Sequence, residues 1–329
     1  MLKVYINLFV LIFFFAGNIQ AATNNCSPPP ENVATLQEIT PGLKTYTVSG
    51  PLAEFNPCDP SVKFLKPNGI ANPPLVIVIH GGAGVDNPTD RVASFFHTKG
   101  FATLTYDAFR MNKIRESVHF LSYQLSNDAR QRMIYKAALR AYHWAIKIDE
   151  IDTKNLYIYG ISNGAVVAAN LAAVVSKSHV KGIFAEGMPG SGLGLPDHPV
   201  VPLRLIYGKL DHYAGKTHDE WVWVRQEPCY VNTHTFNHPP GNSKNCNLYN
   251  NPRDLTQKPI EWINFQRENS KDVDVWFYED AAHAIFAGPF SSNTVTYGAN
   301  LRRFASIGAS DAARNKLSAD IENFVATNR

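Results

Sequence analysis

One pentapeptide of the sequence has the residue types and spacing to present a nucleophile. It reads Gly160-Ile161-Ser162-Asn163-Gly164 and lies between an apolar, strand-like run at 156–159 and an Ala-rich run at 165–173. A strand that turns sharply into a helix holds the central serine in a strained conformation at the top of a sheet. The two glycines lack the Cβ atoms that would collide where strand and helix nearly touch. This context predicts that Ser162 is a nucleophile.

A nucleophilic serine needs a base to take its proton and an acid to orient that base. His283 comes directly after the apolar run 273–278 and Ala281-Ala282, and Asp211 follows the run 203–207. We therefore expect His283 to be the base and Asp211 to be the acid. Glu186 is the alternative acid, because it also follows a strand-like run. Serine, aspartate and histidine occur in the chain order that accompanies a nucleophile on such a turn.

A second glycine-rich loop is suited to stabilising negative charge on a substrate. The β-branched run 75–79 ends in His80-Gly81-Gly82-Ala83-Gly84. Loops of this His-Gly-Gly type supply one of the two backbone donors of the oxyanion hole in serine esterases. We expect these donors to be the N–H groups of Asn163 and of Gly82 or Ala83, the alternative for the loop being a plain glycine turn. His80 itself is expected to brace the loop through hydrogen bonds.

All these residues come at the ends of apolar runs that read as strands. The run 75–79 is apolar on both faces, which is typical of a central parallel strand covered by helices on both sides. Alternating strands and helices predict an α/β fold with a doubly wound, mostly parallel sheet. Sites in such sheets lie at the carboxyl ends of the strands, so the candidate residues should meet at one edge. Further strands are expected at 44–48, 101–106, 156–159, 180–185, 203–207 and 273–278, and helices at 92–100 and 130–147.

Residues 221–259 interrupt this alternation before the last expected strand. The segment is rich in Asn, Pro and aromatic residues, and we interpret it as an insertion that forms either a lid or a plain surface excursion. The four cysteines of the chain are an even number, which favours disulfides over metal or redox chemistry in an exported protein. Three pairings are possible, and the sequential one closes the shortest loops and would staple the insertion. It joins Cys26 with Cys58 and Cys229 with Cys246.

The first 21 residues have the pattern of a secretory signal peptide. A Lys near the start, an apolar stretch and small residues at the end are its three parts. The apolar stretch is shorter than the about 20 residues that span a bilayer, which disfavours the alternative of a membrane anchor. Removal after Ala21 or Ala22 would leave a secreted or periplasmic chain with a single domain at 22–329.

Composition limits the partners of this chain. The net charge is +3 and no run of Lys or Arg occurs, so neither nucleic acid nor a membrane surface is expected as a partner. No cluster of His, Asp or Glu has the spacing of metal ligands, and we expect neither a metal nor another cofactor. The oligomeric state is left open. A small molecule is therefore the expected partner.

Four segments together resemble the dienelactone hydrolase family of the α/β-hydrolase superfamily, and the likeness covers about 73–324 apart from the insertion. They are 74–82, 160–164, 207–211 and 278–286. The resemblance implies an α/β-hydrolase fold and cleavage of a carboxylic ester through an acyl-enzyme, with Ser162, His283 and Asp211 as the triad. Enzymes of this family that cleave dienelactone use cysteine, so Ser162 favours another ester. The alternatives are a prolyl-type exopeptidase, although Ala165 replaces its usual glycine, and a binding protein without catalytic activity.

Overall fold

The computed structural model describes the greater part of the chain. Its described residues are 55–112, 127–188, 193–196, 198–211, 223–224, 256–257, 259–297 and 301–328. The predicted signal peptide, the strand expected at 44–48 and three of the four cysteines lie outside these ranges, so the disulfide pairing stays a prediction. Cys58 is exposed, and its backbone N–H donates to Asn56 Oδ1. Within the described ranges, no helix is both long and apolar enough to cross a bilayer.

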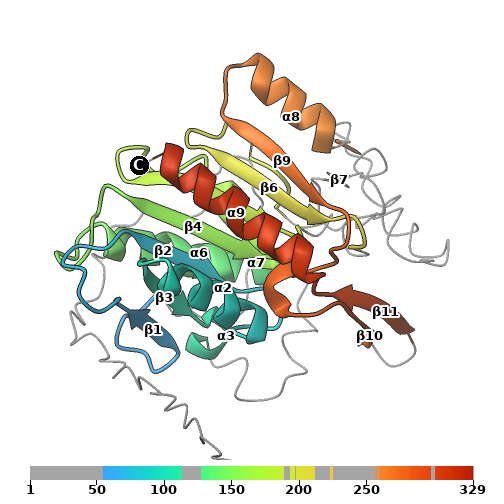
Figure 1. Ribbon diagram of the computed structural model, residues 1–329, viewed down its shortest axis with the longest axis horizontal. Coiled ribbons are helices and arrows are strands. Elements are labelled where there is room, and N and C mark those ends of the chain that lie inside the picture. Colours follow the sequence, from blue (N-terminus) through green and yellow to red (C-terminus); the bar gives the residue numbers. More distant parts are fainter. Residues whose placement is uncertain are drawn as a thin grey trace, which may run out of the picture.

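A seven-stranded sheet forms the centre of the fold (Figure 1). Its spatial order is β1-β3-β2-β4-β5-β6-β9, and each neighbouring pair is parallel except β1 with β3. The strands are β1 Val62–Leu65, β2 Leu75–Ile79, β3 Ala102–Tyr106, β4 Leu156–Ile161, β5 Val180–Glu186, β6 Leu203–Gly208 and β9 Val273–Tyr278. The predicted doubly wound α/β sheet is thus confirmed.

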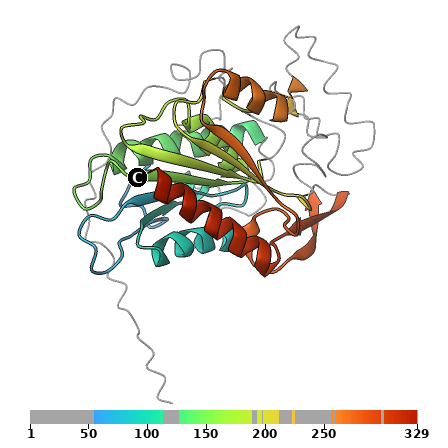
Figure 2. The same cartoon turned by 45° about the horizontal axis from the view of Figure 1, so that its top comes forward.

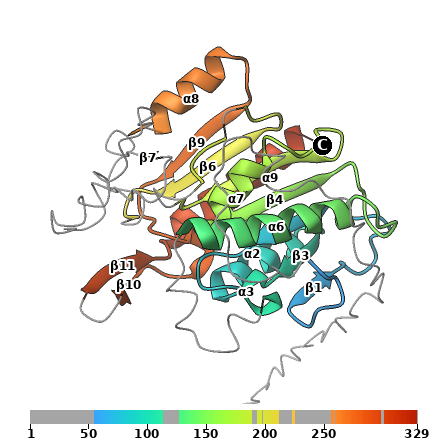
Figure 3. The same ribbon diagram turned by 180° about the vertical axis from the view of Figure 1, so that it is seen from behind.

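Helices cover both faces of this sheet. On β2, Ile77 belongs to one apolar cluster with residues of α6 and α7, whereas Val78 belongs to another with residues of α2 and α9. Figures 1 and 3 show α2 and α9 on one side of the sheet and α6 and α7 on the other. The bounds are α2 Asn87–Thr98, α3 Ala108–Met111, α6 Asn127–Ala145, α7 Asn163–Leu171, α8 Pro259–Glu268 and α9 Asp311–Thr327. Burial on both faces explains why the central strands are continuously apolar.

Several expected bounds differ from the structure; the helix expected at 130–147, for example, is Asn127–Ala145. The helix expected from residue 92 begins at Asn87, because the Asp86 side chain accepts the Thr89 N–H and Pro88 fits the first turn. The run 273–278 is the last strand of the main sheet only. Two later strands, β10 Ser291–Tyr297 and β11 Leu301–Ile307, pair as an antiparallel hairpin that projects beyond the sheet (Figure 2).

Only two short pieces of the expected insertion are described before its end. They are β7 Trp223–Val224 and β8 Thr256–Gln257, which pair as antiparallel strands. The helix α8 then begins at Pro259, where we placed the end of the insertion. The role of the insertion as a lid stays a prediction.

Candidate active site

The chain turns sharply at Ser162, between the end of β4 at Ile161 and the start of α7 at Asn163. Ser162 has φ 56° and ψ −119°, a conformation that costs a residue with a side chain about 1–3 kcal/mol. Its N–H donates to the carbonyl of Glu186 at 2.8 Å, which ties the turn to the end of β5. The half-buried serine thus lies at the N-terminus of α7, where the helix dipole favours negative charge.

Two glycines flank Ser162 where strand and helix nearly touch. A Cβ added at Gly160 would lie 2.6 Å from the Gly164 carbonyl carbon and 2.7 Å from Ala168 Cβ. A Cβ added at Gly164 would lie 2.9 Å from the carbonyl carbon of Ile79. These distances are shorter than any ordinary contact between such atoms, so only glycine fits at either position.

We expect Gly160→Ala to lose both stability and turnover. The new methyl group must push the backbone of the turn aside, at a cost of about 1–3 kcal/mol in the free energy of unfolding. Gly69→Ala is the matched control: its φ of +78° strains alanine, but no atom lies within 4 Å of the added Cβ. Thermal unfolding and ester turnover check both variants. The account fails if Gly160→Ala keeps wild-type kcat, or if Gly69→Ala loses it.

His283 and Asp211 form a buried hydrogen-bonded pair. His283 Nδ1 lies 2.9 Å from Asp211 Oδ2. Because an ionised carboxylate can only accept, Nδ1 carries the proton and Nε2 of the neutral ring keeps its lone pair. The loops that carry the two residues pack tightly, since a Cβ added at Gly208 would lie 2.7 Å from the Ala282 nitrogen. The structure therefore pairs His283 with the acid that we favoured.

The surroundings of His283 raise its pKa. Burial, the largest single influence, lowers the pKa of His283, but the charge and hydrogen bond of Asp211 together with the charges of Glu186 and Asp86 outweigh it. The net pKa lies above the ordinary value of 6.5. This arrangement favours the imidazolium that forms whenever His283 takes a proton.

The carboxylate of Glu186, our alternative acid, accepts hydrogen bonds from two other groups. The Tyr159 hydroxyl donates to Oε2 at 2.7 Å, and the Ile285 N–H donates to Oε1. Burial and the neighbouring charge of Asp211 raise the pKa of Glu186, whereas these hydrogen bonds and the proximity of His283 lower it, and the net shift is upward. The Glu186 carboxylate therefore bonds to Tyr159 and Ile285, whereas His283 bonds to Asp211.

Sequence reasoning missed Gly187, which contacts the His283–Asp211 pair. Its φ is +64°, and an added Cβ would lie 2.8 Å from His283 Nδ1 and 3.3 Å from Asp211 Oδ2. Gly187 directly follows Glu186, whose carbonyl holds the Ser162 N–H. The end of β5 therefore links the nucleophile turn to the His283–Asp211 pair. The sequence signal that could have identified Gly187 is a glycine that directly follows a carboxylate at the end of an apolar run.

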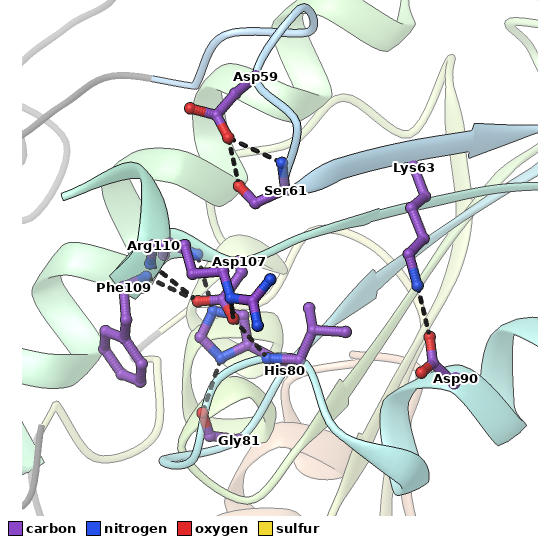
Figure 4. A network of polar contacts seen from close by, with 11 residues as sticks. Asp59, Ser61, Lys63, His80, Gly81, Asp90, Asp107, Phe109 and Arg110 are labelled. Atoms are coloured by element: carbon purple, nitrogen blue, oxygen red, sulfur yellow. Dashed lines mark hydrogen bonds and ion pairs between the residues drawn. The ribbon is translucent and has the colours of Figure 1, made fainter. Parts of the chain in front are cut away.

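The glycine-rich loop after β2 lies against the turn at Ser162 and is braced by His80 (Figure 4). The Ala108 N–H donates to His80 Nε2 at 3.0 Å, so Nδ1 must donate to the Gly81 carbonyl at 2.7 Å. A Cβ added at Gly81 would lie 3.2 Å from Ser162 Cβ. The predicted bracing role of His80 is thus confirmed.

Asp107, at the end of β3, fixes the other side of the loop (Figure 4). Its Oδ2 accepts the Val85 N–H at 3.1 Å, and its Oδ1 accepts the N–H groups of Phe109 and Arg110, the second and third residues of α3. Ala83 lies exposed between the braced residues. The loop is therefore held by hydrogen bonds on both sides of its exposed tip.

A buried amide that the sequence did not reveal orients Asn163. Gln131 Nε2 donates to Asn163 Oδ1 at 2.8 Å, and Gln131 Oε1 accepts the Leu193 N–H at 2.8 Å. The Asn163 amide also packs against the loop, since a Cβ added at Gly82 would lie 2.7 Å from its Nδ2. The two residues expected to supply oxyanion donors are therefore neighbours. Across the described residues, no group of three or more His, Cys, Asp or Glu is arranged to hold a metal ion.

Known proteins share the fold but little sequence. No family model and no curated protein matches the sequence. A dienelactone hydrolase-type protein from Klebsiella pneumoniae has a TM-score of 0.51 at 14% identity, over 80% of this chain and 92% of that chain. A dienelactone hydrolase-like promiscuous phosphotriesterase from metagenomic libraries has a TM-score of 0.50 at 14% identity, over 81% and 92%. The chain therefore has the α/β-hydrolase fold of the dienelactone hydrolase-like proteins.

Proposed function

We propose that this protein is an exported serine hydrolase that cleaves a carboxylic ester of a small molecule. Two features support the proposal: the buried His283–Asp211 pair and the strained turn at Ser162, both of which contact the end of β5 at Glu186 and Gly187. A binding protein has no need of a serine held at this energetic cost. The predicted signal at residues 1–21 supports export.

In the first half of the reaction, Ser162 Oγ attacks the ester carbonyl carbon. His283 Nε2 accepts the hydroxyl proton, because Nδ1 is committed to Asp211. The carbonyl oxygen becomes an oxyanion, which the backbone N–H groups of Asn163 and of Gly82 or Ala83 stabilise. When the C–O bond to the alcohol breaks, His283 returns the proton to the leaving oxygen and Ser162 carries the acyl group.

Water completes the reaction on the same residues. His283 takes a proton from water, and the hydroxide attacks the acyl carbon to form a second oxyanion. Collapse of this intermediate releases the acid and returns the proton to Ser162. Asp211 remains ionised throughout and stabilises the imidazolium in both halves. No step requires a metal or an organic cofactor.

The pH dependence of ester hydrolysis tests this assignment. The base must be neutral, so kcat/KM should rise with pH through the pKa of free-enzyme His283. Because the pKa of His283 is raised, the midpoint of this acid limb should lie above 6.5. The measurement is kcat/KM for a short-chain p-nitrophenyl ester across the pH range in which the fold is intact.

The pH dependence of the free energy of unfolding is the control for this activity profile. A raised folded-state pKa makes the contribution of His283 to stability complete below 6.5 and lost as pH rises through the raised pKa. The activity limb and the stability contribution of His283 therefore run in opposite directions. An acid limb with its midpoint well below 6.5, or one that follows unfolding, would contradict the assignment.

A further inference from the structure

Glu186 is the last residue of β5, an interior strand that lies between β4 and β6. Its side chain is almost fully buried. A buried carboxylate is costly unless it is hydrogen-bonded, and here both oxygens accept hydrogen bonds, from the Tyr159 hydroxyl and the Ile285 N–H. The proposed reaction uses Asp211 as its acid, so it leaves this second buried carboxylate without a role.

The contacts of Glu186 join the two halves of the candidate site. Its backbone carbonyl accepts the Ser162 N–H at 2.8 Å, and its side chain holds Ile285, two residues after His283. Ala284, between them, has φ 53°, which a residue with a side chain adopts only when its surroundings hold it there. The bond to Ile285 therefore holds the strained turn that carries His283.

The hydrogen bonds of Glu186 also favour its ionised form. A backbone N–H can only donate, and the buried Tyr159 hydroxyl uses its proton to donate as well. Both partners therefore suit a carboxylate that only accepts. Among the residues that the structure describes, the charged groups that act on His283 include Asp211 on the β6 side, Glu186 on β5 and Asp86 ahead of α2. Glu186 in turn faces the phenols of Tyr159 and Tyr278, both of which stay neutral because burial raises their pKa.

We propose that Glu186 is a positioning residue for the esterase reaction. Its carboxylate holds the His283 turn against the strand end that carries Ser162, and it places a second negative charge beside the imidazolium. This inference rests on the proposed function. It assigns Glu186 a role separate from that of Asp211, which bonds directly to the imidazole.

Glu186→Gln tests the charge while keeping the shape. The amide oxygen can still accept the Ile285 N–H, and the NH₂ group can donate to the Tyr159 oxygen. Loss of the charge should lower the pKa of His283 and move the acid limb of kcat/KM down by about one pH unit. We expect kcat to fall about tenfold, the equivalent of one pKa unit of lost imidazolium stabilisation, with KM nearly unchanged.

Asp86→Asn is the matched control. It makes the same exchange of carboxylate for amide near His283, and asparagine still caps α2 through its side-chain oxygen. The effect of Asp86 on the pKa of His283 is smaller than that of Glu186, so the acid limb should move less and kcat should stay at the wild-type value. Equal shifts in the two variants would overturn the specific role of Glu186.

Each outcome decides the proposal. A fall in kcat without movement of the acid limb would show that Glu186 is only structural, and wild-type values of both would remove its role altogether. Should Glu186→Gln not fold, the ¹³C carboxyl shift of labelled wild-type Glu186 gives its charge directly. A protonated carboxyl at the pH of full activity overturns the proposal. Ester turnover by the wild type separates failure of this inference from failure of the proposed function.

Discussion

Ser162→Ala is expected to lower kcat for ester hydrolysis roughly a million-fold, because loss of the nucleophile abolishes the acyl-enzyme route. The fold should remain, since the Ser162 N–H bond to Glu186 uses only backbone atoms. The measurement is steady-state turnover of a p-nitrophenyl ester, with thermal unfolding as the check on structure.

Ser178→Ala is the control for this variant. Ser178 is exposed, and its hydroxyl shares a hydrogen bond with the Ser176 hydroxyl. It should keep the wild-type kcat. A folded Ser162→Ala protein that still turns over ester at more than about one per cent of the wild-type rate would exclude Ser162 as the nucleophile.

Asp211→Asn should have the second-largest effect. Its amide can donate to His283 Nδ1, which would leave the ring proton on Nε2 and remove the base. In serine proteases the equivalent change costs roughly 10⁴-fold in kcat while the geometry survives. We expect a loss of the same order here, measured as kcat at a pH above the acid limb of the wild type.

Two variants set the scale for Asp211→Asn. Asp280→Asn changes an exposed carboxylate three residues before His283 and should leave kcat unchanged. Glu186→Gln should lower kcat only about tenfold, because it removes a neighbouring charge and leaves the His283–Asp211 hydrogen bond in place. If Asp211→Asn were nearly as active as the wild type and Glu186→Gln inactive, the two carboxylates would exchange roles.

The central strands were predictable because each is a continuous apolar run bounded by turn residues. Runs such as Leu75–Ile79 are buried on both faces, and this burial is visible in composition without knowledge of neighbours. The rule that sites collect at the carboxyl ends of parallel strands then brought Ser162, Asp211 and His283 to one edge. Predicting that these residues meet at one edge of the sheet required only local sequence patterns and the topology of parallel sheets.

The short edge strand β1 and the helix α9 were missed for different reasons. β1 has four partly exposed residues and pairs antiparallel with β3, so it lacks the doubly apolar pattern of the central strands. α9 did carry a signal: the Ser310 hydroxyl accepts the Ala313 N–H, and Leu317 and Ile321 are buried four residues apart. A search for this cap would have found the helix.

The role of Glu186 could not be deduced from the sequence. Its contact with Ile285 joins residues 99 positions apart, and its bond to Tyr159 joins residues 27 apart. Sequence patterns placed Glu186 at a strand end, where it was the alternative to Asp211 as the partner of His283. Only the three-dimensional arrangement shows that Asp211 fills that position and that Glu186 bonds to the neighbouring turn.

Reaction with an organophosphonate reports directly whether Ser162 is an activated nucleophile. Ser162 is nucleophilic only if His283 and the oxyanion donors are both in place, and the tetrahedral phosphonate adduct mimics the intermediate that they stabilise. The account predicts one stoichiometric adduct by intact mass, located on Ser162 by peptide digestion and absent from Ser162→Ala. His283→Ala should label far more slowly. Folded wild-type protein that stays unlabelled at high probe concentration, even after proteolytic nicking within 221–259, would contradict the account.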